Sequence, residues 1–125
     1  MGSQERIYDL EERTAKFAEE TLKLIKQIKL VDYNRNIIIQ LIKAVTSVGA
    51  NYMEATAAES KKDFIHKMGI SKKEIKETKH WFRMLVIVNP EIKNDLRSLW
   101  QEAQELTLIF SQSIITSRSK KEEIV

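Results

Sequence analysis

The stretch from Ser47 to Lys67 reads SVGANYMEATAAESKKDFIHK and joins the end of one nearly apolar helix to the start of another. Ser60 followed by Asp63 forms a capping box, in which each side chain can satisfy a free backbone N–H at the start of a helix. The Asp63 carboxylate also suits the positive end of the helix dipole. The stretch therefore predicts two long helices that meet at a short corner.

Hydrophobic spacing predicts four helices along the chain. In each of four segments apolar residues recur every three or four positions, which is the period of a helix face packed on a core. Because the connections are short, we expect an all-α, antiparallel, up-down-up-down four-helix bundle. The helices are predicted at about 9–30, 33–58, 61–88 and 90–117, with an N-terminal tail at 1–8 and a charged C-terminal tail at 118–125.

Capping residues and a glycine set the expected helix boundaries. Asp9 with Glu12 forms a capping box for the first helix, and Asn89 before Pro90 marks the start of the fourth. Gly69 lowers the helix propensity of the third segment, which leaves a break near residues 69–71 open. The core positions are predicted to be Phe17, Leu24, Leu41, Val45, Tyr52, Phe64, Phe82, Leu96, Leu99 and Leu106.

The second segment is apolar on two faces, and from Ile37 to Ala58 only Lys43 and Glu54 are formally charged. A chain of 125 residues has little room for a helix that is buried on all sides, so we expect one face in the core and the other between subunits. Polar residues along the segment argue against a membrane span. The predicted oligomer interface comprises Ile39, Ile42, Thr46 and Met53 of this segment and Trp81 of the third, although Trp81 at the core edge is an equal alternative.

Composition excludes several classes of protein. The chain is 42% hydrophobic and 31% charged, with three Gly, one Pro and no Cys. Without cysteine it can form neither disulfides nor thiolate metal sites. The N-terminus lacks the basic-then-apolar pattern of a signal peptide, so a cytoplasmic location is expected. The sequence contains no nucleophile elbow with a serine between glycines and no phosphate-binding glycine loop, and we expect a non-enzymatic protein without a cofactor.

Three short segments, SVGANYMEA, SKKDFIHK and KETKHWF, resemble the four-helix-bundle proteins encoded in intervening sequences of bacterial 23S rRNA genes. YDLEERTAKFA fits the same family, and the resemblance covers about residues 7 to 118. It implies a left-handed bundle that assembles as a ring-like homopentamer. The fold is also similar to the accessory variability protein of diversity-generating retroelements, which is basic and binds nucleic acid. Met53 departs from the family, which commonly has Arg there, and this weakens any transfer of nucleic-acid binding through the second helix.

A ridge of positive charge runs along the third segment. Residues 60–89 hold eight Lys/Arg and three Asp/Glu, whereas the whole chain has a net charge of only +3. The ridge is formed by Lys72, Lys76, Lys79 and Arg83, which lie within a sector of about 60° on a helix, and is flanked by Lys73. Such a ridge can follow the phosphate backbone of RNA or of a nucleoprotein. The alternatives are a solvated helix face and a protein-interaction module with no nucleic-acid role.

Two further groups of polar residues have mainly structural interpretations. Asn51, Glu54, Lys62 and Asp63 lie close to the corner between the second and third helices and are predicted to form a polar network that holds it. The D-x-x-H pattern at His66 and the E-x-x-H pattern at His80 resemble half of a di-iron site. Both lie on one helix about 21 Å apart, so they cannot share a metal within one subunit, and no metal site is expected.

Overall fold

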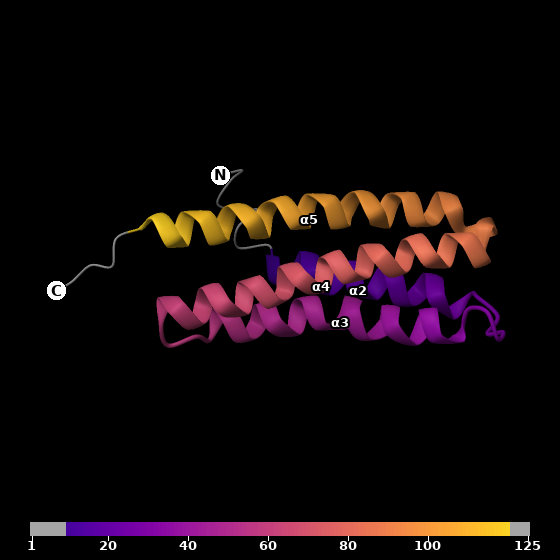
Figure 1. The fold of residues 1–125 in the computed structure, drawn as a ribbon, viewed down its shortest axis with the longest axis horizontal. Helices are drawn as coiled ribbons and strands as arrows, with labels where there is room; N and C mark the ends of the chain where they lie inside the picture. Colours follow the sequence, from indigo (N-terminus) through magenta and orange to yellow (C-terminus); the bar gives the residue numbers. More distant parts are fainter. Residues whose placement is uncertain (1–9, 121–125) are drawn as a thin grey trace.

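The computed structural model describes residues 10–120, which form the predicted four-helix bundle. Helices α2 (Leu10–Lys26), α3 (Arg35–Thr56), α4 (Lys61–Val88) and α5 (Lys93–Ser119) run antiparallel to their neighbours in chain order, and a short 3-10 turn, η1 (Pro90–Ile92), precedes α5. Figure 1 shows α2 as the shortest of the four. No strand occurs between residues 10 and 120.

The core contains side chains from all four helices. Seven of the ten predicted core positions are buried, and the other three, Tyr52, Phe64 and Leu99, are half-buried and pack against the core. Phe17 and Phe82 meet edge to face with ring centroids 6.2 Å apart, and Tyr52 and Phe110 do the same at 5.9 Å. The 3-4 spacing therefore identified the buried face of each helix correctly.

Small residues allow close approach of the helices. A Cβ added at Gly49 of α3 would lie 3.2 Å from the Oγ1 of Thr14, a buried residue of α2. The buried Ser71 hydroxyl of α4 donates a 2.9 Å hydrogen bond to the Val48 carbonyl of α3. Among adjacent helices the α3–α4 contact is the most extensive, and the α2–α5 contact is the least extensive.

The first helix ends at Lys26, four residues before its predicted end, because Asn34 organises a turn there. The buried Asn34 side chain accepts a hydrogen bond from the Val31 N–H and donates to the Lys29 carbonyl and to Asn89 Oδ1. Ile28 and Leu30 continue the apolar spacing beyond the helix, which is why spacing alone extends it too far. Asn34 and Asn89 also tie the two turns at one end of the bundle together.

The other boundary signals have mixed outcomes. Ser60 accepts a 3.0 Å hydrogen bond from the Asp63 N–H, as its predicted capping role requires. Gly69 does not break α4, which continues from Lys61 to Val88. The fourth helix begins with η1 at Pro90, and Asn89 makes no capping bond there because its side chain bonds Asn34 and Glu91. Asp9 and both predicted tails, apart from residues 118–120, lie outside the described residues.

Candidate nucleic-acid interface

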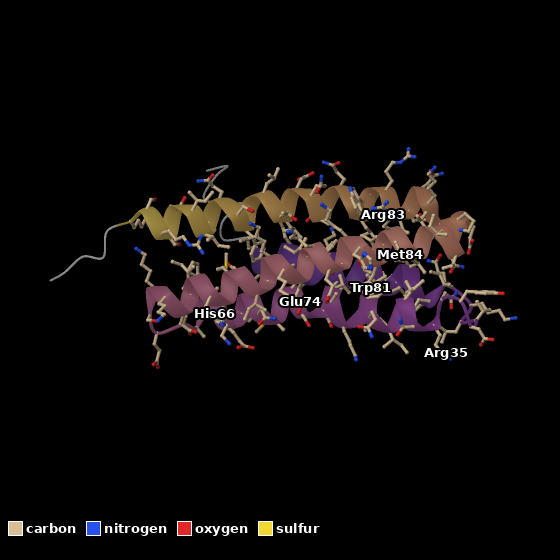
Figure 2. All side chains as sticks on the ribbon, viewed as in Figure 1. Arg35, His66, Glu74, Trp81, Arg83 and Met84 are labelled. Carbon is tan, nitrogen blue, oxygen red and sulfur yellow. The ribbon has the colours of Figure 1, made fainter. Side chains whose placement is uncertain are left out.

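The cationic ridge, defined as Lys72, Lys73, Lys76, Lys79 and Arg83, lies on α4. Lys73, Lys76 and Arg83 are exposed, and Lys72 and Lys79 are half-buried. In Figure 2 Arg83 lies on the side of α4 that faces α5, whereas Trp81 lies toward α3. The ridge therefore follows one flank of α4 and is not centred on the outermost line of the helix.

Within residues 10–120, none of the five ridge side chains forms an ion pair, although other cations of the bundle do. Lys67, on the same helix, donates a 2.6 Å hydrogen bond to Glu54 of α3, and this bond raises the pKa of Lys67. Arg13 is likewise held by two carboxylates of α5. The ridge thus retains positive charge that no ion pair within residues 10–120 neutralises.

Lys79 differs from its neighbours because it contacts α5. Its ammonium lies 4.8 Å from the centre of the Trp100 ring and hydrogen-bonds the side chain of Gln104. Two exposed cations of α5, Lys93 and Arg97, line a cleft together with Arg83. Neither residue was predicted from the sequence, because the spacing of α5 shows that they avoid its core face but not which helix lies beside them.

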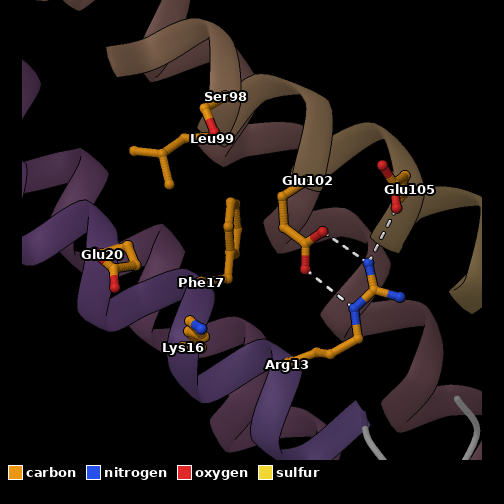
Figure 3. Close-up of a pocket in the computed structure, with 8 residues that line it drawn as sticks. All are labelled: Arg13, Lys16, Phe17, Glu20, Ser98, Leu99, Glu102 and Glu105. Atoms are coloured by element: carbon orange, nitrogen blue, oxygen red, sulfur yellow. Dashed lines mark hydrogen bonds and ion pairs between the residues drawn. The ribbon is translucent and has the colours of Figure 1, made fainter.

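The groove between α2 and α5, of about 540 Å³, has a different character. Figure 3 shows the Arg13 guanidinium bonded to Glu102, at 2.7 and 3.1 Å, and to Glu105, at 3.3 Å. Hydrogen bonding to Glu102 is the main cause that raises the pKa of Arg13 above its usual value. Because Glu20 also lines this groove, its carboxylates outnumber its cations. This groove does not suit a polyanion.

The predicted interface residues on α3 lie on one outer face of the bundle. Ile39 is 45% exposed and Met53 is 57% exposed, Thr46 is exposed, and Ile42 is half-buried. We call these four residues the α3 outer face. Trp81 lies apart from them on α4, half-buried against the core, and its buried Nε1–H has no acceptor within residues 10–120.

The predicted polar network at the α3–α4 corner does not form as a unit. The Asn51 amide donates to the Ser47 carbonyl of its own helix, and Glu54 pairs with Lys67 instead of Lys62. Lys62 is exposed, and the Asp63 N–H bonds the Ser60 hydroxyl. Proximity in sequence misled the prediction, because the residue that reaches Glu54 is Lys67, a little more than one turn further along α4 than Lys62 and Asp63.

The part of the chain that the structure describes offers neither a metal-binding cluster nor a membrane-spanning helix. Residues 10–120 contain no cluster of three or more His, Asp or Glu side chains placed to hold a metal ion, and His66 and His80 belong to none. Within the same residues no helix has the length and apolar character needed to cross a membrane.

Comparisons with known proteins identify the family. A crystal structure of a protein with unknown function from the S23 ribosomal protein family, from Bacteroides thetaiotaomicron, is similar to this chain with a TM-score of 0.73 and 28% sequence identity. The match covers 83% of this chain and 96% of that one. Among curated proteins none matches. The family model for the 23S rRNA-intervening sequence protein matches residues 6–112, and the chain therefore belongs to this family.

Proposed function

We propose that the protein is a non-enzymatic, self-associating scaffold that binds RNA through the cationic ridge of α4. The observation that carries this proposal is the absence of ion pairs from the ridge within residues 10–120, in a bundle where Arg13 and Lys67 are paired. Cations without carboxylate partners are free to replace the counterions of a phosphate backbone. The contacts expected are with phosphates, so recognition should be weakly sequence-specific.

RNA binding is tested by reversing two exposed charges of the ridge. Lys73→Glu with Lys76→Glu should weaken binding of a single-stranded RNA at least tenfold, measured by fluorescence anisotropy, and reduce the salt dependence of the affinity. The matched control is Lys16→Glu with Lys26→Glu, which makes the same charge change on exposed positions of α2. Equal losses in both variants, or no loss in either, would contradict binding through the ridge.

Self-association is the second part of the proposal, and two outer faces support it. Leu108 and Ile115, here called the α5 outer face, are 70% and 57% exposed and lie seven residues apart on α5. Helices α3 and α5 lie diagonally across the bundle. Each of them packs against α2 and α4, and the backbones of α3 and α5 do not approach each other closely. Two apolar faces on opposite sides of a subunit suit head-to-tail contacts, which close into a ring where the rotation between neighbouring subunits brings the last one back to the first. Five subunits is the number that the family resemblance implies.

A mixing experiment distinguishes a head-to-tail ring from a symmetric dimer. Met53→Glu blocks the α3 outer face and Leu108→Glu blocks the α5 outer face, so each variant alone should be monomeric by light scattering. An equimolar mixture should form heterodimers, because one intact face of each kind remains. If Leu108→Glu alone stays associated while Met53→Glu does not, the subunits pair through α3 with α3 and the ring is wrong.

A protein-interaction module without a nucleic-acid role is the second candidate, and the exposure of the α3 outer face favours it. If the protein self-associates but binds no RNA even at low salt, the protein-interaction module replaces the RNA-binding scaffold as the proposed function.

A further inference from the structure

A cleft of about 270 Å³ lies between α4 and α5, near the turn that joins them. Its floor is apolar and consists of Phe82, Val86, Leu96 and the half-buried Trp100. Three exposed cations, Arg83, Lys93 and Arg97, stand at its rim. We call it the α4–α5 cleft. Its volume lies just below the range of sites for drug-sized molecules, so it suits a single ring system.

The charge of the cleft favours an anionic occupant. Its lining contains cations and no carboxylate, in contrast to the α2–α5 groove with its three glutamates. Within residues 10–120 none of Arg83, Lys93 and Arg97 forms an ion pair. Because Arg83 also belongs to the cationic ridge, the cleft continues that ridge toward the α4–α5 turn.

The Trp100 ring already attracts a cation, the ammonium of Lys79. The aliphatic stem of Lys79 is flexible, and the hydrogen-bond partner of its ammonium is the exposed side chain of Gln104. The ammonium can therefore leave the ring without disturbing the core. An ammonium over a partly exposed aromatic ring generally contributes less binding free energy than a stacked base does. Lys79 is not among the residues that line the cleft. A planar base can therefore occupy the cleft and compete with Lys79 for the Trp100 ring.

We propose that the α4–α5 cleft holds one unpaired base of RNA, stacked on Trp100, with the adjoining phosphates on Arg83, Lys93 and Arg97. This inference rests on the proposed RNA binding and specifies its substrate as single-stranded. The floor offers almost no hydrogen-bonding group, so the cleft does not distinguish one base from another. It accepts only a base that is not paired with a second strand. An acidic peptide matches the rim charges but makes no use of the aromatic floor.

The test compares three RNA probes of equal length by fluorescence anisotropy: oligoadenylate, the same strand with abasic sites, and a blunt duplex. Wild-type protein should bind oligoadenylate about tenfold more tightly than the abasic strand. Trp100→Leu should remove this preference while retaining the salt-dependent binding of the abasic strand. Arg97→Gln should weaken binding of both strands, whereas Lys16→Gln, on α2, should leave both unchanged.

Circular dichroism checks that Trp100→Leu remains folded. Trp100→Phe, which keeps an aromatic ring, provides a second variant and should retain part of the preference for oligoadenylate.

Equal affinity for the abasic strand and oligoadenylate in wild type would overturn the inference while the proposed ridge function stands. Binding of the duplex as tight as that of the single strand would also overturn it. If polyglutamate displaces oligoadenylate at equal chain concentration, the cleft is a site for acidic peptides instead. If no probe binds, both the inference and the proposed function fail.

Discussion

Glu74 is a half-buried carboxylate on α4 with a second carboxylate, Glu77, one helical turn away. Burial is the main cause that raises the pKa of Glu74, the charge and hydrogen bond of Glu77 raise it further, and Lys73 opposes them. A raised pKa means that the folded protein binds this proton more tightly than the unfolded chain does. The contribution of Glu74 to stability therefore falls as pH rises through and above 4.5, the pKa expected without these effects.

We predict that Glu74→Gln raises the midpoint of thermal unfolding at pH 7 and has little effect at pH 4, where the wild-type carboxyl is largely protonated in both states. Glu19→Gln, an exposed change on α2, provides the control for loss of one negative charge. Thermal melts followed by circular dichroism at the two pH values measure both variants. A larger stabilisation at pH 4 than at pH 7 would show that the sign is wrong.

Two glycines lie inside helices of the bundle and have different reasons to be there. A Cβ at Gly69 would meet no atom within 4 Å, whereas a Cβ at Gly49 would press on Thr14. Thr14 cannot easily move, because it is buried and its hydroxyl bonds the Glu11 carbonyl. Gly49 therefore sets the approach of α2 to α3, while Gly69 has no packing role within residues 10–120.

We predict that Gly69→Ala raises the free energy of unfolding by about 0.5–1 kcal/mol, because alanine has the higher helix propensity and nothing obstructs it. Gly49→Ala gains the same propensity but must displace Thr14, so it should be neutral or destabilising. Urea unfolding of both variants makes the comparison. Equal stabilisation by the two substitutions would mean that α2 does not pack against α3 at Gly49 as closely as described.

At the scale of the whole molecule, the bundle exposes apolar side chains on two diagonally opposite helices. Ile39 and Met53 on α3 and Leu108 and Ile115 on α5 are each more than 40% exposed. A single subunit has no means of covering both faces, since its helices are already packed against one another. Association with further copies would bury both, and the stability of the fold would then depend on protein concentration.

We predict that the midpoint of thermal unfolding rises with protein concentration for the wild type and is independent of it for the Met53→Glu variant. The reason is mass action: a contact made only by folded subunits stabilises them more as their concentration rises. Differential scanning calorimetry over about a hundredfold range of concentration tests this. A wild-type midpoint that does not move would argue against self-association.

Local periodicity was sufficient to predict the number of helices, their order and the residues that face the core. Each helix carries its apolar side chains at a spacing set by its own geometry, so Phe17, Leu41, Phe82 and Leu106 could be assigned to the interior from their positions alone. The exposure of Ile39 and Met53 followed from the same argument, because α3 has more apolar faces than one core can cover.

Relations between helices required the tertiary structure. Periodicity gives the angle of a side chain around its own helix, but the neighbour on each flank depends on how the helices turn about their axes as they pack. The pairing of Lys67 with Glu54, the position of Lys79 over Trp100 and the joining of Asn34 to Asn89 all cross between helices or turns. The sequence by itself thus determined the bundle and the charge of α4. Only the tertiary structure placed Arg83 beside Lys93 and Arg97 around an apolar cleft, because that placement is a property of two packed helices and not of either one.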